Sequence, residues 1–334
     1  MEYEYLQYSS MYNKHLHLGV TGSIAAFKSL EICRELFNFG IQISVSLTQS
    51  ATQFVTPLSF EALGANQLFR DMFSPQNSTF AHLEPSETAE AMLIAPTTAN
   101  TIAKLANGLA DDMLSCQALA YNGPILLAPA MNPNLWSAKA TQSNLEILRQ
   151  RGTTIIEPQP GTVACGHTGK GRLPDIYQII FKTLKAMTDK DLLDKNILIT
   201  LGSTREFFDP ARFWSNPSSG KMGAALAVAA WLRGANVHCI CGPNHIWLPE
   251  EIKCYPVTSA SQMYEKALEI WPKSDIGCLC AAVSDYRPSE QMQEKFKKNT
   301  YNGGFELKFE SNPDILKKLG ELKTEDQKLI GFAA

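Results

Sequence analysis

The feature that most constrains the fold is an alternation of short apolar runs with amphipathic helical patterns. In the first half of the chain, helical patterns cover 24–39 and 145–151, and a further helix follows the second apolar run. The apolar runs that we interpret as strands are residues 15–20, 42–47, 91–95, 124–128 and 153–156. Strands that alternate with helices are typical of a parallel sheet with helices on both faces.

A charged stretch, residues 189–195, interrupts this alternation, and a second alternating set follows it. The second set contains strands at 196–201, 236–241, 276–282 and 328–332, with a helix at 222–233. Each half opens with a strand, a turn rich in glycine and serine, and a helix. We therefore predict an α/β protein with two doubly wound Rossmann-like domains. The predicted parts are an N-terminal tail (1–14), a first domain (15–188), a linker (189–195) and a second domain (196–334).

Charge and apolar content exclude several classes of function. With a net charge of -3 and a pI of about 6.1, the chain has no general attraction to nucleic acid or anionic membranes. No apolar run approaches the ~20 residues of a membrane span, and no signal peptide precedes the first apolar run. We expect a cytoplasmic protein with reduced thiols.

Two cysteine pairs, Cys239/Cys241 and Cys278/Cys280, lie within predicted strands. Alternation along a strand places both thiols of a pair on one face. A zinc site is conceivable, but the usual two-residue spacer and a histidine cluster are missing. We expect buried structural thiols.

Three loops of the first half are suited to binding a phosphate group. The first contains Gly22 and Ser23 and runs directly into a helix, whose N-terminus favours an anion. The second contains Thr48, and the third is the segment 96–101. All three follow predicted strands, where open α/β sheets bind ligands. A third glycine of the dinucleotide fingerprint is missing, so a mononucleotide fits better than NAD.

Two further loops carry groups suited to catalysis. Residues 129–132 read Pro-Ala-Met-Asn, and residues 164–172 place Cys165 among three closely spaced glycines. Glycine marks positions where a backbone bends tightly or moves, so a thiol there can reach a ligand.

With these loops, the first half resembles the flavin-dependent cysteine decarboxylases, and in particular the phosphopantothenoylcysteine decarboxylases, from about residue 15 to 172. The resemblance implies a flavodoxin-like fold that binds FMN. It assigns His82 as a base, Asn132 to the substrate carboxylate, Met131 to substrate binding and Cys165 as proton donor. The residues that it implies for FMN binding are Gly22, Ser23, Ile24, Thr48, Pro96, Thr97, Thr98 and Asn100.

The second half contains long motifs at 201–206, 209–223, 281–287 and 312–315. Small polar residues that run into the helix after Gly220 form another anion-binding turn. The first glycine of a Walker loop is missing at the required spacing.

These motifs resemble bacterial phosphopantothenate–cysteine ligases, which are fused behind the decarboxylase in bifunctional coenzyme A biosynthesis proteins. The resemblance implies that CTP activates 4′-phosphopantothenate as an acyl-cytidylate, which cysteine then attacks. It assigns Lys295 to the triphosphate, Arg212 and Asn216 to the acyl group, and Asp285 to the nucleotide and Mg²⁺. The remaining implied nucleotide-binding residues are Ala281, Ala282, Asn312, Pro313, Asp314, Ile315 and Phe332.

The resemblance also implies decarboxylase trimers linked through ligase dimers. Ligase relatives continue past residue 334, so we expect this ligase half to be incomplete and weakly active. Two alternatives share the first fold: a decarboxylase of peptidyl cysteine and a regulatory flavoprotein of the halotolerance type. Both lack the ligase half.

Overall fold

The computed structural model describes residues 6, 11–74, 78–296 and 306–332, so most of the expected tail 1–14 lies outside the described residues. The chain divides into two compact units. One holds Tyr8–Thr188, and the other holds Asp189–Ala334 together with Met1–Gln7. Within the described ranges, no helix has the length and apolar character needed to cross a bilayer.

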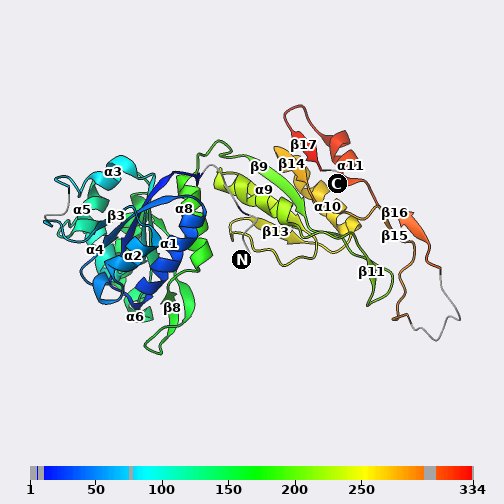
Figure 1. The fold of residues 1–334 in the computed structure, drawn as a ribbon. Helices are drawn as coiled ribbons and strands as arrows, with labels where there is room; N and C mark the ends of the chain where they lie inside the picture. Colours follow the sequence, from blue (N-terminus) through cyan, green and yellow to red (C-terminus); the bar gives the residue numbers. More distant parts are fainter. Residues whose placement is uncertain (1–5, 7–10, 75–77, 297–305, 333–334) are drawn as a thin grey trace. The chain divides into compact units, whose positions relative to one another are not determined.

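The unit Tyr8–Thr188 is built on a six-stranded parallel sheet (Figure 1). The strand order is β3-β2-β1-β4-β5-β6, so the order reverses between β1 and β4. Such a reversal opens a crevice at the carboxyl ends of the two strands. The strands are β1 (His15–Val20), β2 (Gln42–Leu47), β3 (Gln67–Phe69), β4 (Ala91–Thr97), β5 (Ile125–Pro129) and β6 (Thr154–Ile155).

Helices cover both faces of this sheet. On one face, α4 (Ala99–Asn107), α5 (Met113–Ala120) and α7 (Lys139–Gln150) pack on β4 and β5 through one apolar cluster. On the other face, α1 (Lys28–Asn38) packs against α8 (Ile176–Met187). The shorter helices are η2 (Ile24–Phe27), η3 (Ala51–Gln53), α2 (Pro57–Leu63), α3 (Glu84–Thr88) and α6 (Pro133–Ser137).

The expected parallel sheet is confirmed, and three local predictions need correction. The predicted helix 24–39 begins as the 3-10 turn η2 and becomes an α-helix only at Lys28. The sheet has a sixth strand, β3, that the sequence did not reveal. The segment around Cys165 is an antiparallel hairpin of β7 (Gln159–Thr162) and β8 (Thr168–Arg172).

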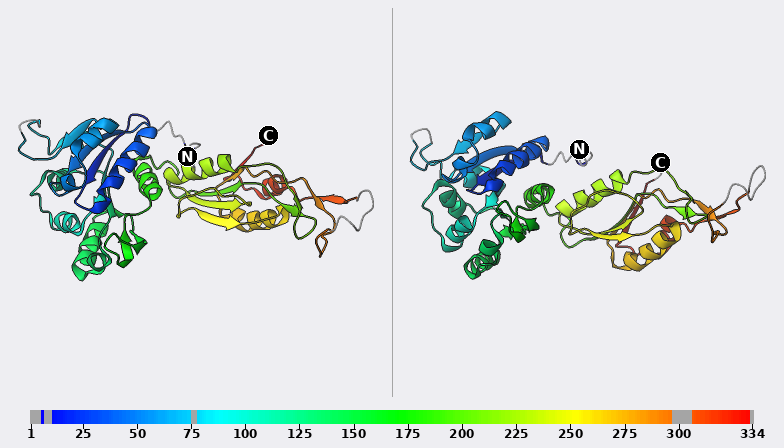
Figure 2. Two further views of the ribbon diagram at one scale, coloured as in Figure 1. Left: turned by 60° about the horizontal axis from the view of Figure 1, so that its bottom comes forward. Right: turned by 90° about the horizontal axis from the view of Figure 1, so that it is seen from below.

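The second unit has a five-stranded parallel sheet in the order β13-β12-β9-β14-β17, again with a reversal, here between β9 and β14. Along β9, Leu198 joins a core with α10 (Ala260–Ile270) and α11 (Ile315–Leu322), while α9 (Lys221–Leu232) also contacts this strand (Figure 2). The strands are β9 (Asn196–Leu201), β12 (Asn236–Cys241), β13 (Lys253–Pro256), β14 (Ile276–Leu279) and β17 (Lys328–Gly331), with η4 (Trp271–Lys273) before β14.

Two hairpins extend this unit: β10 (Glu206–Phe207) with β11 (Phe213–Trp214), and β15 (Tyr286–Pro288) with β16 (Phe309–Ser311). Neither hairpin nor β13 was predicted. The predicted strand 276–282 ends at Leu279. Beyond it, the Cys280 N–H is shared between the carbonyl and the hydroxyl of Thr200 on β9, at 3.2 and 3.1 Å, and the Ala281 N–H donates to the same hydroxyl at 3.1 Å.

The prediction of buried structural thiols is partly wrong. All eight cysteines are free thiols, but of the two C-x-C pairs Cys239 alone is buried. Cys241, Cys278 and Cys280 are half-buried, since both pairs lie at the ends of their strands.

Candidate active sites

The three predicted phosphate-binding loops meet at the carboxyl ends of β1, β2 and β4. The Thr21 hydroxyl donates to the Pro96 carbonyl at 2.8 Å and accepts from the Thr98 N–H at 3.0 Å. Gly22 lies against the loop after β2, where a Cβ atom would come within 2.3 Å of the Ser50 Cβ. Only glycine allows this approach, so Gly22 fixes the spacing of the first two loops.

Two helices begin at these loops with capped N-termini. The Ser23 hydroxyl accepts from the Ala25 N–H at the start of η2, and the Thr98 hydroxyl accepts from the Thr101 N–H at the start of α4. N–H groups at such ends favour an anion.

The other predicted FMN-binding residues lie on the same loops. Thr48 is half-buried, with a hydroxyl that accepts from the Ala51 N–H at 3.2 Å. The hydroxyl of buried Thr97 donates to the Ile94 carbonyl, whereas Asn100 is exposed at the first turn of α4. The Thr97 carbonyl is also engaged, since it accepts from the Ala130 N–H at 3.2 Å.

Asn132 and Cys165 lie in direct contact, although 33 residues separate them. The Asn132 Nδ2 group donates to Cys165 Sγ at 3.1 Å and to His167 Nδ1 at 3.0 Å. Its Oδ1 atom accepts from the Asn134 N–H at 2.8 Å, as the cap of α6. This third bond fixes the amide so that its N–H groups face the thiol.

Close backbone packing holds the β7–β8 hairpin against the asparagine loop. The Met131 N–H donates to the Gly171 carbonyl at 2.9 Å, and a Cβ atom on Gly171 would lie 2.3 Å from the Met131 carbonyl oxygen. At the tip of the hairpin, Gly166 has a φ of +81°, which turns the chain sharply after Cys165.

The pKa of the exposed Cys165 thiol is below its ordinary value. The backbone N–H of His167 is the main cause, and the Asn132 side chain adds to it. Both donors stabilise the thiolate, which makes the thiol a stronger acid. Sequence reasoning missed His167, although it lies two residues from the cysteine.

A cavity of about 590 Å³ lies between the start of α1 and this hairpin. Its volume is typical of small-molecule sites, which span roughly 300–1,000 Å³. Predicted residues that line it are Ser23, Ile24, Met131, Asn132 and Cys165, and the structure adds Lys28, Glu31, Arg172 and Tyr177.

His82 does not line this cavity. It is half-buried in a turn that precedes α3, next to the buried Ala81. The described structure of one chain thus brings together Asn132 and Cys165 but not the third predicted catalytic group.

The second unit has a cavity of about 710 Å³ at the carboxyl ends of β9 and β14, where the strand order reverses. The N-termini of α9 and α11 also border it. The predicted residues that line it are Asn216, Ala281, Ala282, Asp285, Asn312, Pro313, Asp314, Ile315 and Phe332.

Hydrogen bonds join the loops around this cavity. Asn216 Nδ2 donates to the Val283 carbonyl at 3.1 Å, and Asn312 Nδ2 donates to the Ser284 carbonyl at 2.7 Å. Gly220 is the N-cap of α9 with a φ of +73°, and the first residues of that helix, Lys221, Met222 and Gly223, line the cavity.

Arg212 and Lys295 lie outside this set of lining residues. The Arg212 guanidinium donates to Asp209 at 2.7 Å and to the Phe296 carbonyl at 3.1 Å. The Asp209 carboxylate is fully buried and also accepts from the Phe296 N–H at 3.0 Å. This ion pair therefore holds the backbone directly beside the exposed Lys295.

Sequence reasoning missed Asp209. Burial alone would raise the pKa of its carboxyl group, but N–H groups of Ala211, Phe296 and Arg212 and the Arg212 guanidinium outweigh burial and lower it.

Asp285 is exposed and lines the cavity together with Asp314, whose carboxylate accepts from the Lys317 N–H as the cap of α11. In the described part of the chain, no three His, Cys, Asp or Glu side chains cluster as a metal site would require.

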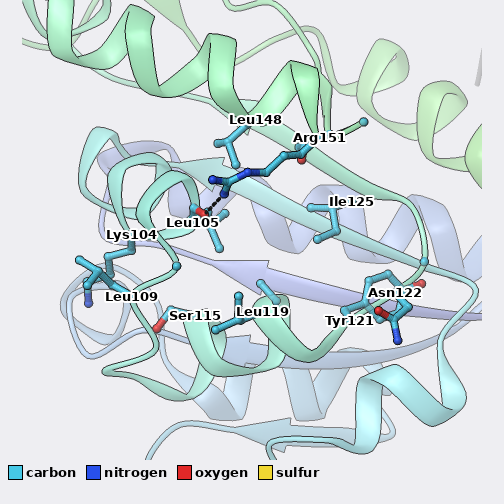
Figure 3. Close-up of a pocket in the computed structure, with 15 residues that line it drawn as sticks. Lys104, Leu105, Leu109, Ser115, Leu119, Tyr121, Asn122, Ile125, Leu148 and Arg151 are labelled. Carbon is cyan, nitrogen blue, oxygen red and sulfur yellow. Dashed lines mark hydrogen bonds between the residues drawn. The ribbon is translucent and has the colours of Figure 1, made fainter.

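A third cavity, of about 300 Å³, lies among α4, α5 and α7 and contains none of the predicted site residues (Figure 3). Its cationic side chains are engaged within the protein. Arg151 donates to the Leu105 carbonyl at 3.3 Å, and Lys104 pairs with Asp111 and Asp112. This arrangement gives no support for a further catalytic site.

Comparison with known proteins gives the family. The family model described as "Flavoprotein" matches residues 4–188, and that of the DNA/pantothenate metabolism flavoprotein C-terminal domain matches residues 192–334. The coenzyme A biosynthesis bifunctional protein CoaBC of Bacillus subtilis is 42% identical over 327 residues, covering 96% of this chain and 80% of that protein. Its Escherichia coli K12 counterpart is 39% identical, covering 97% of this chain and 81% of that protein.

Solved structures align with about half of the chain. A PPC decarboxylase mutant complexed with pantothenoylaminoethenethiol is 28% identical, with a TM-score of 0.47, and covers 51% of this chain and 96% of its own. The FMN-dependent cysteine decarboxylase SpaF is 30% identical, with a TM-score of 0.47, and the match covers 54% of this chain and 100% of SpaF. From the two family models and the curated relatives, the chain belongs to the bifunctional coenzyme A biosynthesis proteins, flavoproteins that join a phosphopantothenoylcysteine decarboxylase to a phosphopantothenate–cysteine ligase.

Proposed function

We propose that the first unit decarboxylates 4′-phosphopantothenoylcysteine at the cavity beside Asn132 and Cys165. The contact between Asn132 and Cys165 carries this proposal, because it places an amide donor and an acidic thiol together at the mouth of a ligand-sized cavity.

The flavin of this unit is FMN, because the loops after β1, β2 and β4 provide one phosphate site beside two helix N-termini. The residues that would hold it are Gly22, Ser23, Ile24, Thr48, Pro96, Thr97, Thr98 and Asn100. Mass spectrometry of the cofactor released from the purified protein tests this assignment. We expect the mass of FMN, and recovery of FAD or a nicotinamide would contradict it.

The chemistry that bound FMN would supply is a reversible two-electron oxidation of the cysteine moiety, which would allow carbon dioxide to leave. His82 accepts a proton on its imidazole during the oxidative phase. Asn132 orients the substrate carboxylate through its N–H groups, and Met131 lines the substrate cavity. Cys165 then donates its Sγ proton to the substrate carbon, which gives the saturated product.

The second unit is the ligase, which joins cysteine to 4′-phosphopantothenate with CTP as co-substrate. Two alanines, Ala281 and Ala282, let the nucleotide base approach the backbone, and the segment 312–315 and Phe332 frame it. Asp285 with the phosphate groups would hold Mg²⁺, since this ion needs few protein ligands beside a nucleotide.

Lys295 stabilises the triphosphate, and Asn216 and Arg212 orient the acyl group. The side chain of Asn216 supports this assignment, because it lines the nucleotide cavity. Asn216→Ala should abolish CTP-dependent ligation and leave decarboxylation intact. Loss of both activities would instead indicate a folding defect.

We further propose that the protein is a homo-oligomer, with trimeric decarboxylase and dimeric ligase units. A second subunit would supply the His82 that the cavity of one chain lacks. Exposed aromatic side chains on the two hairpins of the second unit, Phe213, Trp214, Tyr286 and Phe309, suit a dimer surface. The cytoplasmic location stays a prediction from the sequence.

A further inference from the structure

Four polar side chains are buried in the first unit beside the apolar core. His17 lies on β1, Ser44 and Ser46 lie on β2, and Gln117 lies on α5; each is at most 1% exposed. None of them lines the cavity at Asn132 and Cys165. Burial of polar groups costs free energy unless their hydrogen bonds are satisfied, so this cluster needs an explanation.

The cluster forms a directed chain of hydrogen bonds. Ser46 donates to Gln117 Oε1, and His17 Nε2 lies 3.1 Å from the same oxygen. An amide oxygen only accepts, so His17 must carry its proton on Nε2. Its Nδ1 then accepts from the Ser44 hydroxyl at 2.8 Å. Burial lowers the pKa of His17 to about 3, which keeps this tautomer neutral.

This chain of hydrogen bonds ends at the turn that contains His82. With its oxygen held by His17 and Ser46, Gln117 directs its Nε2 group to the Ala81 carbonyl at 3.1 Å. A flipped amide would place its oxygen against the Ala81 carbonyl, two acceptors, and its NH2 group against the Nε2–H of His17, two donors. Ala81 is 2% exposed and packs with Phe69 and Met113.

Few other bonds hold this turn. Among the described residues, its backbone bonds are local, such as Ala81 N–H to the Ser78 carbonyl at 3.3 Å and Leu83 N–H to the Phe80 carbonyl at 2.7 Å. The hydrogen bond from Gln117 therefore connects the turn 78–84 to the buried part of the unit.

We propose that Gln117 is a positioning residue for His82, with its amide oriented by His17. The inference rests on the proposed role of His82 as base. A bond to the carbonyl of the residue that directly precedes the base holds the backbone from which the imidazole projects. Small displacements of a catalytic group cost up to about a hundredfold in rate.

The test uses two variants of the full-length flavoprotein. Gln117→Met removes the whole amide, whereas Gln117→Glu keeps an acceptor for His17 and Ser46 and loses the N–H donor to Ala81. We expect kcat for decarboxylation to fall by about ten- to a hundredfold in both, with KM and flavin absorbance little changed. The pH profile of kcat should also shift, because the surroundings of His82 change.

Two controls separate positioning from general destabilisation. Ser44→Ala removes the bond to His17 Nδ1 but leaves that from Gln117 to Ala81. Thr183→Val removes a hydroxyl that is equally buried and donates to the Ile179 carbonyl at 2.8 Å in α8. We expect kcat within about twofold of the wild type for both.

Hydrogen exchange of residues 78–84 gives a readout that is independent of catalysis. It should be about tenfold faster in both Gln117 variants and unchanged in the controls. Unchanged exchange would overturn the inference. Faster exchange in the Gln117 variants with a normal kcat would also overturn it, provided that His82→Asn inactivates the otherwise wild-type protein. A fully active His82→Asn would instead refute the proposed base, while exchange would still show whether Gln117 holds the turn.

Discussion

The exposed thiol of Cys165 shows how two single residues set the chemistry of a site. Its pKa is lowered by the His167 N–H and the Asn132 side chain. The protonated thiol is the proposed donor, so the donor fraction falls as pH rises through that pKa. A lowered pKa therefore moves the alkaline loss of product formation to lower pH.

Asn132→Ala removes one of these two donors, so the pKa of Cys165 should rise toward its ordinary value. Thiolate absorbance followed against pH measures the change, with Cys165→Ser as the blank for the other cysteines. Identical titration curves for the wild type and Asn132→Ala would show that the 3.1 Å contact does not lower the pKa of the Cys165 thiol.

The burial of His17 leads to a prediction about how the free energy of unfolding depends on pH. Burial lowers its pKa from 6.5 to about 3. Below pH 6.5 the unfolded chain takes up a proton that the folded unit does not, so the free energy of unfolding decreases as pH falls toward 3. One such proton contributes a slope of roughly 1.4 kcal/mol per pH unit.

His17→Gln keeps polar atoms in the site and removes the titrating group, so this part of the slope should disappear. Urea unfolding across the pH window, followed by release of the flavin, measures it. Equal slopes for the variant and the wild type would mean that His17 is not the group responsible.

At the scale of secondary-structure elements, the central strands could be predicted and the edges and hairpins could not. Strands such as β4 and β9 are buried along nearly their whole length, so they appear in the sequence as nearly continuous apolar runs. The edge strand β3 has three residues and β13 is mostly exposed, so neither has a clear hydrophobic pattern.

The β7–β8 hairpin escaped prediction for a different reason. Its sequence is rich in glycine and contains proline, residues that disfavour strands. The hairpin forms because Gly171 packs directly against the backbone of Met131, a contact between distant segments. The sequence therefore identified Asn132 and Cys165 separately, and the structure was needed to show how they meet.

The loop that holds Lys295 depends on Asp209. Asp209→Asn removes the charge that pairs with Arg212 and weakens the bond to the Phe296 N–H. Asp209 is buried but the Arg212 side chain is 43% exposed and can regain water, so the loss is smaller than for a pair buried on both sides. We expect CTP-dependent ligation to fall by at least about tenfold, measured as pyrophosphate release, with decarboxylation unchanged.

Asp191→Asn is the matched control for this variant. Asp191 pairs with Arg233 in the same unit, but both side chains are exposed. Exposed pairs contribute little, so ligation should stay normal. Equal losses in the two variants would contradict a specific role for Asp209.

At the scale of the whole molecule, the proposed oligomer explains the position of His82. If His82 acts in a cavity of another subunit, variants that are inactive alone should complement each other. We expect His82→Asn and Cys165→Ser, co-expressed and purified through two different tags, to form the saturated product. No recovery of product in the hybrid oligomers would place both groups in one subunit's site.

The central claim is that Cys165 donates the proton that completes decarboxylation, and the product formed by Cys165→Ser from 4′-phosphopantothenoylcysteine tests it most directly. A serine hydroxyl is a far weaker acid than a thiol. We predict that this variant binds FMN normally and releases carbon dioxide but forms no 4′-phosphopantetheine, which the wild type does form. Formation of 4′-phosphopantetheine by Cys165→Ser at the wild-type rate would contradict the account.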